Sequence, residues 1–524
     1  MIETVAEAFL ETAARSADRP AFHVTASTAA AYGIAPGEIT YGEAITRVMQ
    51  LRANFRVAGY GMGHRAALLL ENRPAFFLNW LALNGLGVSV VPLNPDLRAA
   101  DLAYVIGHAE PDLIVAAPER HGDLAEAADR ANISPAIVAE GEAPPRLDDA
   151  ANEILPTRAT EAAILYTSGT TGAPKGCVLS NDYFLSAGEW YAAAGGLCAL
   201  SDDGERMLTP LPTFHMNAMA YSFMAMVQVG GCLIALDRLH PTTWWEDVAG
   251  SGATSLHYLG VMPTMLMAAA PSPADRAHKV RFGFGAGVDP KLHAPFEDRF
   301  GFPLVEAWAM TETGAGAVIA ANNAGRPVGR SCLGRPAPTV DARIGDEGEL
   351  LVRAAGPDPR KGFFSHYHKD PQATDDAWAG GWFHTGDIVA RDDAGYVYFT
   401  DRLKNVIRRS GENIAAVEVE STLLRHPSVT AAAVTAVPDE IRGDEVFACI
   451  VADAPSADLA EAIVRFALAE LAYFKAPAYI AFVDALPVTA TQKVQRGELK
   501  ALAKRLLDDP ATHCLGHLKK RASA

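Results

Sequence analysis

A ten-residue stretch of the chain gathers glycines, hydroxyls and one lysine at a spacing that suits anion binding. It reads Thr-Ser-Gly-Thr-Thr-Gly-Ala-Pro-Lys-Gly over residues 167–176. Glycines allow successive backbone N–H groups to turn toward an anion, while hydroxyls and the lysine add donors and positive charge. We therefore expect a polyphosphate to bind here, and the candidate residues are Thr167, Ser168, Gly169, Thr170, Thr171, Gly172 and Lys175.

This stretch differs from the Walker phosphate loop. A proline, Pro174, precedes Lys175, and no serine or threonine follows the lysine. An ordinary glycine-rich turn is the alternative interpretation, and the density of donors argues against it. A second glycine-rich segment, 283–287, is only a weak nucleotide signal, because it lacks the GxGxxG spacing of dinucleotide sites.

Thr311 and Glu312 together offer a hydroxyl and a carboxylate oxygen. A magnesium ion that bridges phosphate groups prefers such hard oxygen ligands. The alternative is a helix-capping threonine beside a solvated glutamate. Both interpretations stay open when the pair is judged by itself.

Short apolar runs alternate with helical stretches in the first half of the chain, which is typical of an α/β fold. The phosphate-binding stretch lies between two segments that we expect to be extended, 162–167 and 177–179. Ser180 or Asn181 is placed to cap a helix after them. Further upstream the pattern predicts a strand at 66–70, a helix at 74–86 and a strand at 88–91.

The composition changes near Thr400, where residues 401–414 combine charges and turn formers in a short span. A chain of 524 residues is expected to form more than one domain. We place the boundary here, between residues 1–401 and residues 402–524. The second part has an α+β pattern, with helices expected at 416–426 and 457–472 and strands at 429–437 and 445–451.

The formal charge of -17, from 45 basic and 62 acidic residues, argues against binding to nucleic acid or to an anionic membrane. The basic tail Lys519-Lys520-Arg521 is expected to be a solvated, frayed terminus. Residues 207–236 carry no Asp, Glu, Lys or Arg, but prolines and a Gly-Gly pair interrupt them, so no membrane span is expected. Six cysteines without CxxC spacing and an acidic start without a secretory pattern indicate a cytoplasmic protein.

Seven further motifs follow the phosphate-binding stretch along the chain. They are Pro212–His215, Gly285–Gly287, Trp308–Glu312, Trp382–Asp387, Asp401–Lys404, Ser410–Asn413 and Pro487–Lys493. In order and spacing they resemble the adenylate-forming superfamily of acyl-CoA synthetases, luciferases and peptide-synthetase adenylation domains, over nearly the whole chain. The resemblance implies a large N-terminal domain of mixed sheets flanked by helices, with a small barrel, followed by a small mobile α+β C-terminal domain.

The resemblance also implies an ATP site, with magnesium bound at Thr311 and Glu312. Trp308 stands where the family usually has a tyrosine that stacks on adenine, and the alternative is a core tryptophan. Asp387 resembles the carboxylate that accepts both ribose hydroxyls. The cofactor-binding residues implied in this way are Gly285, Ala286, Gly287, Glu306, Ala307, Trp308, Asp387, Arg402, Lys404 and Gly411.

Lys493 resembles the lysine that offsets the repulsion between an attacking carboxylate and the α-phosphate. Gln492 replaces the glycine that usually precedes this lysine. Lys404 resembles the hinge about which the small domain rotates between two half-reactions, and Gly411 would line the tunnel for the pantetheine arm of coenzyme A. The implied catalytic residues are Lys493, Thr311, Glu312 and His215.

Within the superfamily, residues 212–218, the Trp244-Trp245 region and residues 473–477 most resemble the crotonobetaine/carnitine–CoA ligase group. The implied activity converts a small to medium organic acid to an acyl-adenylate and then to its CoA thioester, releasing pyrophosphate and AMP. Ala309 replaces the usual glycine of the acid pocket, and the alternative for several pocket residues is that they pack the core. The implied pocket residues are His215, Asn217, Met219, Leu259, Gly260, Val261, Gly287 and Ala309.

Three other functions stay open at this stage. They are an aryl-acid–CoA ligase, a free-standing acid adenylation enzyme, and a nucleotide-binding sensor without turnover. Retention of Lys493 and Glu312 argues against the sensor. The expected partners are a small-molecule carboxylic acid, ATP and CoA, and the sequence leaves a homodimer open.

Overall fold

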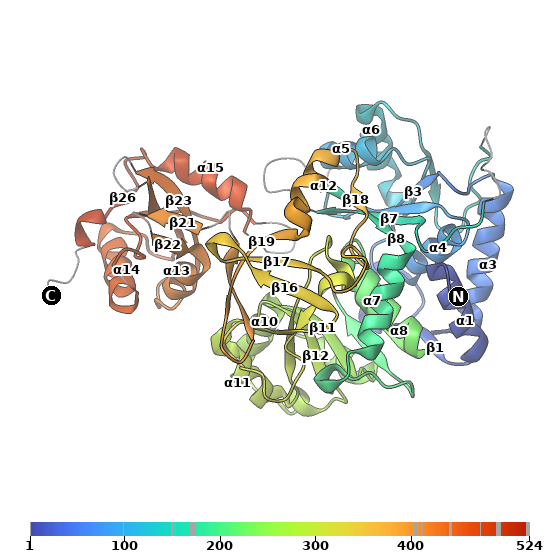
Figure 1. Ribbon diagram of the computed structural model, residues 1–524, viewed down its shortest axis with the longest axis horizontal. Coiled ribbons are helices and arrows are strands. Elements are labelled where there is room, and N and C mark those ends of the chain that lie inside the picture. The colour runs from blue at the N-terminus through green and yellow to red at the C-terminus, as the bar shows by residue number, and fades with distance from the viewer. Residues whose placement is uncertain are drawn as a thin grey trace.

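The computed structural model describes residues 2–97, 99–147, 151, 154–167, 174–402, 406–409, 412–439, 443–471, 473–488 and 494–519. Their strands form three sheets of 13, 7 and 6 strands. Figure 1 shows a large body that carries the first part of the chain and a smaller body that carries the last part. The fold is therefore α/β with a separate smaller C-terminal unit, which confirms the expected class.

The seven-stranded sheet has the order β18-β8-β7-β4-β3-β5-β6. Strands β3 to β7 run parallel to one another where they pair, whereas β8 is antiparallel to both β7 and β18. The strands are β3 (Arg65–Leu69), β4 (Ser89–Pro92), β5 (Leu113–Ala116), β6 (Ala136–Ala139), β7 (Glu161–Thr167), β8 (Lys175–Ser180) and β18 (His366–Tyr367). The helices nearest to it in sequence are α3 (Tyr41–Val57), α4 (Pro74–Asn84), α5 (Ala99–Ala109), α6 (His121–Ala131) and α12 (Pro371–Ala377).

The thirteen-stranded sheet begins with a largely parallel part. Strands β9, β11, β12 and β13 are parallel neighbours, so their carboxyl ends meet at one edge. This part comprises β1 (Pro20–Val24), β2 (Gly37–Thr40), β9 (Arg206–Thr209), β10 (Cys232–Ala235), β11 (Ser255–Leu259), β12 (Phe282–Ala286) and β13 (Leu304–Trp308). Helices of the same region are α1 (Val5–Arg15), α2 (Ala26–Tyr32), α9 (Trp244–Gly250), α10 (Val261–Ala268) and α11 (Pro290–Phe300).

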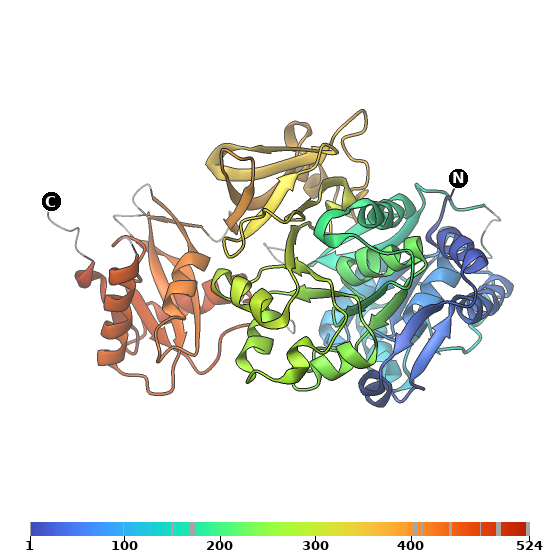
Figure 2. The same ribbon diagram turned by 90° about the horizontal axis from the view of Figure 1, so that it is seen from below.

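The rest of this sheet is antiparallel and strongly curved. Figure 2 shows it, in yellow and orange, as a layer of its own beside the large body. We expected a small barrel for this unit, and its strands pair as an open row in the order β16-β17-β19-β20-β15-β14. Its strands are β14 (Ile319–Ala320), β15 (Cys332–Pro336), β16 (Val340–Ile344), β17 (Glu349–Ala354), β19 (Phe383–Arg391) and β20 (Val397–Arg402).

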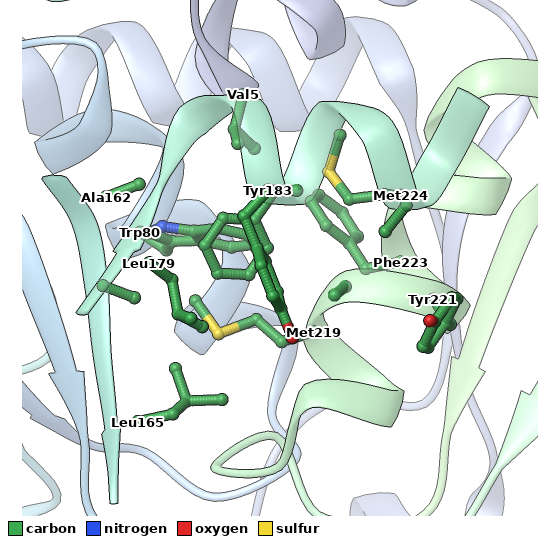
Figure 3. Packing of buried hydrophobic residues seen from close by; sticks show 14 of the residues in the cluster. Val5, Trp80, Ala162, Leu165, Leu179, Tyr183, Met219, Tyr221, Phe223 and Met224 are labelled. Atoms are coloured by element: carbon green, nitrogen blue, oxygen red, sulfur yellow. The ribbon is translucent and has the colours of Figure 1, made fainter. Parts of the chain in front are cut away.

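One apolar core joins the two large sheets. It is built around α7 (Asn181–Ala193), the π-helical turn η3 (Asn217–Phe223) and α8 (Met224–Val229), and Figure 3 shows Trp80, Tyr183 and Phe223 packed within it. Ser180 begins α7, because its side chain accepts a hydrogen bond of 3.4 Å from the backbone N–H of Tyr183. This confirms the predicted cap and fixes the end of β8 against the core.

The smaller body has its own six-stranded sheet and its own apolar clusters. Asp401 at the end of β20 reaches it, since Oδ2 accepts a hydrogen bond of 3.4 Å from the backbone N–H of Val417. The strands are β21 (Val406–Arg409), β22 (Glu412–Ala415), β23 (Ala431–Asp439), β24 (Gly443–Val451), β25 (Tyr479–Phe482) and β26 (His513–Cys514). The helices are α13 (Ala416–Leu423), α14 (Ala457–Glu470) and α15 (Arg496–Leu506).

The expectation of a solvated terminus is wrong for Lys519. Its side chain is 1% exposed, and Nζ lies 2.6 Å from Oε1 of Glu445. The carboxylate of Glu445 is itself buried and also binds Arg409, so cationic partners stabilise its charge. Lys520 and Arg521 lie outside the described residues.

The helix and strand predictions near the site are confirmed, with ends that shift by one to a few residues. Residues 207–236 form β9, η3, α8 and β10, as their prolines and glycines suggested. Within the described part of the chain, no helix is both long and apolar enough to cross a bilayer.

Candidate active site

The predicted phosphate-binding stretch connects the antiparallel strands β7 and β8. Thr167 and Lys175 face each other at the loop end of this hairpin. The residues between them, 168–173, lie outside the described residues, and with them the predictions for Ser168, Gly169, Thr170, Thr171 and Gly172. The structure therefore places the two ends of the stretch and its lysine.

Lys175 and Glu312 lie on either side of Tyr367. The ammonium of Lys175 is 4.8 Å from the centroid of the Tyr367 ring, and the Tyr367 hydroxyl donates a hydrogen bond of 2.9 Å to Oε1 of Glu312. Burial, followed by the charge of Glu312, raises the pKa of Tyr367 well above its usual range. The phenol therefore stays protonated and holds the carboxylate in place. Tyr367 was missed from the sequence.

A tight turn holds Glu312 at the carboxyl end of β13. The hydroxyl of Thr313 accepts a hydrogen bond of 2.9 Å from the backbone N–H of Met310. Gly314 follows with φ of +46°, and a Cβ there would lie 2.3 Å from the ring of Tyr183. Only glycine fits this approach. Thr311 is half-buried in the same turn, beside Glu312.

Trp308 and Arg402 both bind Asp387. Nε1 of Trp308 donates a hydrogen bond of 2.8 Å to Oδ2 of Asp387, and Nε of Arg402 lies 2.8 Å from Oδ1. Asp387 of β19 faces Arg402 of β20 in the sheet register, which fixes the ion pair. The three predicted nucleotide residues are thus brought together.

The predicted acid-binding glycines meet at the carboxyl ends of β11 and β12. Leu259 is paired with Ala286 in the register. A Cβ on Gly260 would lie 1.7 Å from the carbonyl oxygen of Gly287, and a Cβ on Gly285 would lie 2.2 Å from the carbonyl oxygen of Tyr258. The backbones approach so closely that side chains are excluded, and Val261 begins α10 immediately afterwards.

The Pro212–His215 motif is fixed by a buried asparagine. Oδ1 of Asn72 accepts a hydrogen bond of 2.9 Å from the backbone N–H of Thr213, and its amide nitrogen donates to the carbonyl oxygens of Leu211 and Leu236. His215 follows this turn and is exposed. Asn72 was missed from the sequence, because its partners lie 139 to 164 positions away.

Comparison with known proteins agrees with this geometry. The sequence profile of the AMP-binding enzyme family matches residues 9–357, and the profile of the AMP-binding enzyme C-terminal domain matches residues 418–493. The chain belongs to the AMP-binding enzyme family.

Named relatives of this AMP-binding enzyme are CoA ligases. It is 32% identical to a sulfoacetate–CoA ligase of Cupriavidus necator, over 88% of this chain and 92% of the relative. It is 30% identical to a crotonobetaine/carnitine–CoA ligase of Escherichia coli O157:H7, over 91% and 96%. The crystal structure of ATP-bound MatB from Rhodopseudomonas palustris has the same fold, with a TM-score of 0.78, 24% identity and coverage of 96% and 100%.

Two predicted site residues of the AMP-binding enzyme have other surroundings. Met219 is fully buried in the apolar core shown in Figure 3, so its side chain packs the core and is no part of the acid pocket in this conformation. The carboxylate of Glu306 accepts a hydrogen bond of 3.2 Å from the backbone N–H of Val288 and lies 3.7 Å from His293. This carboxylate therefore faces α11, and burial raises its pKa.

The remaining predicted residues divide into two groups. Ala307 lies in β13 and is paired with Ala320, and Ala309 is half-buried just beyond that strand. Lys404, Gly411 and Lys493 lie outside the described residues. Val488 and Val494, which flank residues 489–493 in the sequence, form a β-bridge.

The described residues around Glu312 suit a magnesium ion only in company with phosphates. Within the described ranges, no three His, Cys, Asp or Glu side chains are grouped closely enough to hold a metal by themselves. Magnesium is usually held by one or two carboxylates together with water and substrate phosphates. Glu312 with Thr311 fits that pattern.

Proposed function

We propose that this AMP-binding enzyme is an ATP-dependent acid–CoA ligase that activates a small to medium organic acid. The observation that carries the proposal is that Lys175, at the loop end of the β7–β8 hairpin, and Glu312 both contact Tyr367. Tyr367 thus contacts both a cation suited to the phosphates and a hard carboxylate suited to their counterion. The CoA ligases among its relatives support the choice of acceptor.

The position of the acid follows from the sheet. Strands β11, β12 and β13 are parallel neighbours and end at Leu259, Ala286 and Trp308. Ligands of such sheets bind beyond the carboxyl ends of the strands. We place the acid over Gly260, Gly287 and Ala309, and the adenosine between Trp308 and Asp387.

In the first proposed step, an oxygen of the acid attacks the α-phosphorus of ATP, and the bond to the leaving pyrophosphate breaks. Lys175 and Lys493 offset the negative charge that accumulates on the reacting oxygens. Thr311 and Glu312 would hold a magnesium ion, which supplies further positive charge to the phosphates. His215 lies in the loop next to the acid and is proposed to orient it.

In the second step, the thiolate sulfur of CoA attacks the acyl carbon and AMP leaves with the electron pair of the broken C–O bond. We propose that residues 402–524 rotate between the steps, about a hinge at Lys404. In support, β20 ends at Arg402, and the next strand, β21, belongs to a different sheet. Gly411 would then line the path of the thiol.

The test uses purified protein with ATP, magnesium, CoA and a panel of acids. We expect pyrophosphate release that depends on the acid, and a CoA thioester detected by mass spectrometry. Pyrophosphate without thioester would favour a free-standing adenylation enzyme, and no pyrophosphate with any acid would favour a sensor. We also propose a cytoplasmic location, because all six cysteines, each within the described ranges, are free thiols. Light scattering would distinguish a monomer from a homodimer.

A further inference from the structure

A buried polar cluster is centred on His257 of β11, two residues before Leu259 of the proposed acid pocket. His257 of β11 is fully buried, and its ring contacts three polar side chains. Nδ1 lies 2.6 Å from Oδ1 of Asn217 and 2.7 Å from Oγ of Ser222, while Nε2 lies 2.9 Å from the Tyr191 hydroxyl. Apolar and aromatic side chains, including Phe284 at 5.4 Å between ring centroids, surround the cluster.

The hydrogen bonds of the cluster are all satisfied by one arrangement of protons. If Nδ1 of His257 carries the hydrogen, it donates to Oδ1 of Asn217, and Nε2 accepts from the Tyr191 hydroxyl. Ser222 then donates to the carbonyl oxygen of Asn217, 3.2 Å away. In the other neutral tautomer, the Tyr191 hydroxyl has no acceptor among the described residues. A buried donor without an acceptor destabilises the folded state and is rare in proteins.

This arrangement determines which way the Asn217 amide points. Because Oδ1 accepts from His257, the NH₂ group is turned away from the ring. Among the described residues, this nitrogen donates no hydrogen bond to a neighbour. It is also absent from the buried polar atoms that lack a partner, so it is not sealed off from the surface. Asn217 is half-buried and begins η3, a π-helical turn, which is a local irregularity often found at functional sites.

The face of the sheet beneath Asn217 leads to the acid site. Side chains two residues apart on a strand point to the same face, so Leu259 lies on the face of His257. In the neighbouring strand Phe284 and Ala286 are their register partners. Phe284 and His257 form a buried layer, and Leu259 and Ala286 form the more exposed layer at the end of the strands.

The side chains on this face carry no formal charge. Burial lowers the pKa of His257 to about 3, so its ring is neutral near pH 7. Leu259, Ala286 and Asn217 are uncharged residue types. A charged group on the acid would lose hydration here without gaining a counterion.

We propose that His257 is a positioning residue that turns the NH₂ group of Asn217 toward the acid, and that the acid carries an uncharged hydrogen-bond acceptor remote from the carboxylate being activated. This inference rests on the proposed acid–CoA ligase function and adds the class of acid. The two named relatives are called after sulfoacetate and after crotonobetaine and carnitine, which are acids with a charged tail. The acid proposed here has an uncharged acceptor in place of that charge.

The test compares acids of equal shape that differ by one acceptor. Benzoate is compared with the three pyridine carboxylates, and pentanoate with 4-oxopentanoate, by kcat/KM for pyrophosphate release. For each set we divide kcat/KM of an acid with the acceptor by kcat/KM of the acid without it. The largest of these ratios is called the acceptor preference. We expect it to be about tenfold or more, because an acid without the acceptor leaves the Asn217 donor unpaired. Asn217→Leu should reduce it to about one by raising KM for the acceptor acid, with little change for its partner.

Two substitutions of His257 separate positioning from packing. The amide nitrogen of His257→Asn takes the place of Nδ1 and can still donate to Asn217, whereas His257→Gln places its amide near Nε2 and Tyr191. We expect His257→Asn to keep the acceptor preference and His257→Gln to lose it, with both variants folded by circular dichroism. In the unmodified protein, ¹⁵N NMR of histidine should show His257 as the neutral Nδ1–H tautomer, a readout independent of turnover.

The outcomes distinguish this inference from the proposed function. If acids are activated but Asn217→Leu leaves the acceptor preference unchanged, or if acids with a charged tail are the better substrates, the inference is overturned and the ligase function stands. An Nε2–H tautomer would also overturn it. If no acid supports pyrophosphate release, both fail together.

Discussion

The indole Nε1 of Trp308 donates a hydrogen bond of 2.8 Å to Oδ2 of Asp387, whose side chain is 2% exposed. Nε of Arg402 lies 2.8 Å from Oδ1 and forms an ion pair with the same carboxylate. Arg402 is the more exposed member of this ion pair, with 42% of its side chain exposed. The tryptophan links the proposed adenine and ribose contacts in one hydrogen bond.

Replacing this tryptophan tests the link. Trp308→Phe removes the donor, leaves a buried carboxylate with one partner fewer, and should lower the free energy of unfolding by about 1–3 kcal/mol. KM for ATP should rise, because the Asp387 carboxylate is less fixed. The matched control is Trp378→Phe, since both tryptophans are 6% exposed and Nε1 of Trp378 has no hydrogen-bond partner among the described residues. Equal effects of the two substitutions on KM for ATP would contradict the link.

Tyr367→Phe should lower activity while the fold is kept. The variant loses the hydrogen bond of 2.9 Å to Glu312 but retains the ring that contacts Lys175. Hydrogen bonds to charged groups contribute about 1.5–3 kcal/mol, so kcat/KM for ATP should fall by roughly 10- to 100-fold. Tyr60→Phe is the control, because the Tyr60 hydroxyl is buried without a described partner. If the Tyr367→Phe enzyme kept the same rate and the same magnesium dependence, the assignment of Glu312 to the phosphate site would be wrong.

Lys493→Ala should separate the two half-reactions. Without the ammonium, attack on the α-phosphate loses its charge compensation, so acyl-adenylate formation should be crippled. Thioester formation from supplied acyl-adenylate and CoA should stay largely intact, because we propose that this step uses the other orientation of the small domain. Single-turnover assays of each half-reaction measure this. Equal losses in both would count against the rotating-domain proposal.

Features that depend on neighbouring residues could be predicted from the sequence. The strand at 66–70 and the helix at 74–86 follow from local apolar patterns, and the Ser180 cap follows from residue type. The sequence also indicated that Trp308, Asp387 and Arg402 share a site, through the resemblance of their motifs. In the structure, the pairing of β19 with β20 places Asp387 opposite Arg402, and one hydrogen bond joins Trp308 to Asp387.

Features that depend on distant partners could not be predicted. Tyr367 binds Glu312 across 55 positions, and His257 binds Asn217 across 40, so no local pattern marks either pair. Glu306 was assigned to the nucleotide, but its strand register turns the carboxylate toward His293. Which face a strand residue occupies depends on the whole sheet, and one step along a strand reverses it.

The buried His257 ring also predicts a pH dependence of stability. Its pKa is about 3 in the folded protein against 6.5 as the ordinary value, so between these pH values the unfolded chain binds a proton that the folded chain does not. Stability therefore falls as the pH falls below 6.5, by up to about 1.4 kcal/mol for each pH unit. His257→Asn lacks this group, and its stability in urea should fall less steeply from pH 6.5 to pH 4. Carboxylates titrate in both proteins, so their contribution cancels in the difference. Parallel slopes for the two proteins would show that the pKa of the ring in the folded protein is close to its ordinary value, so that burial does not hold the ring neutral below pH 6.5.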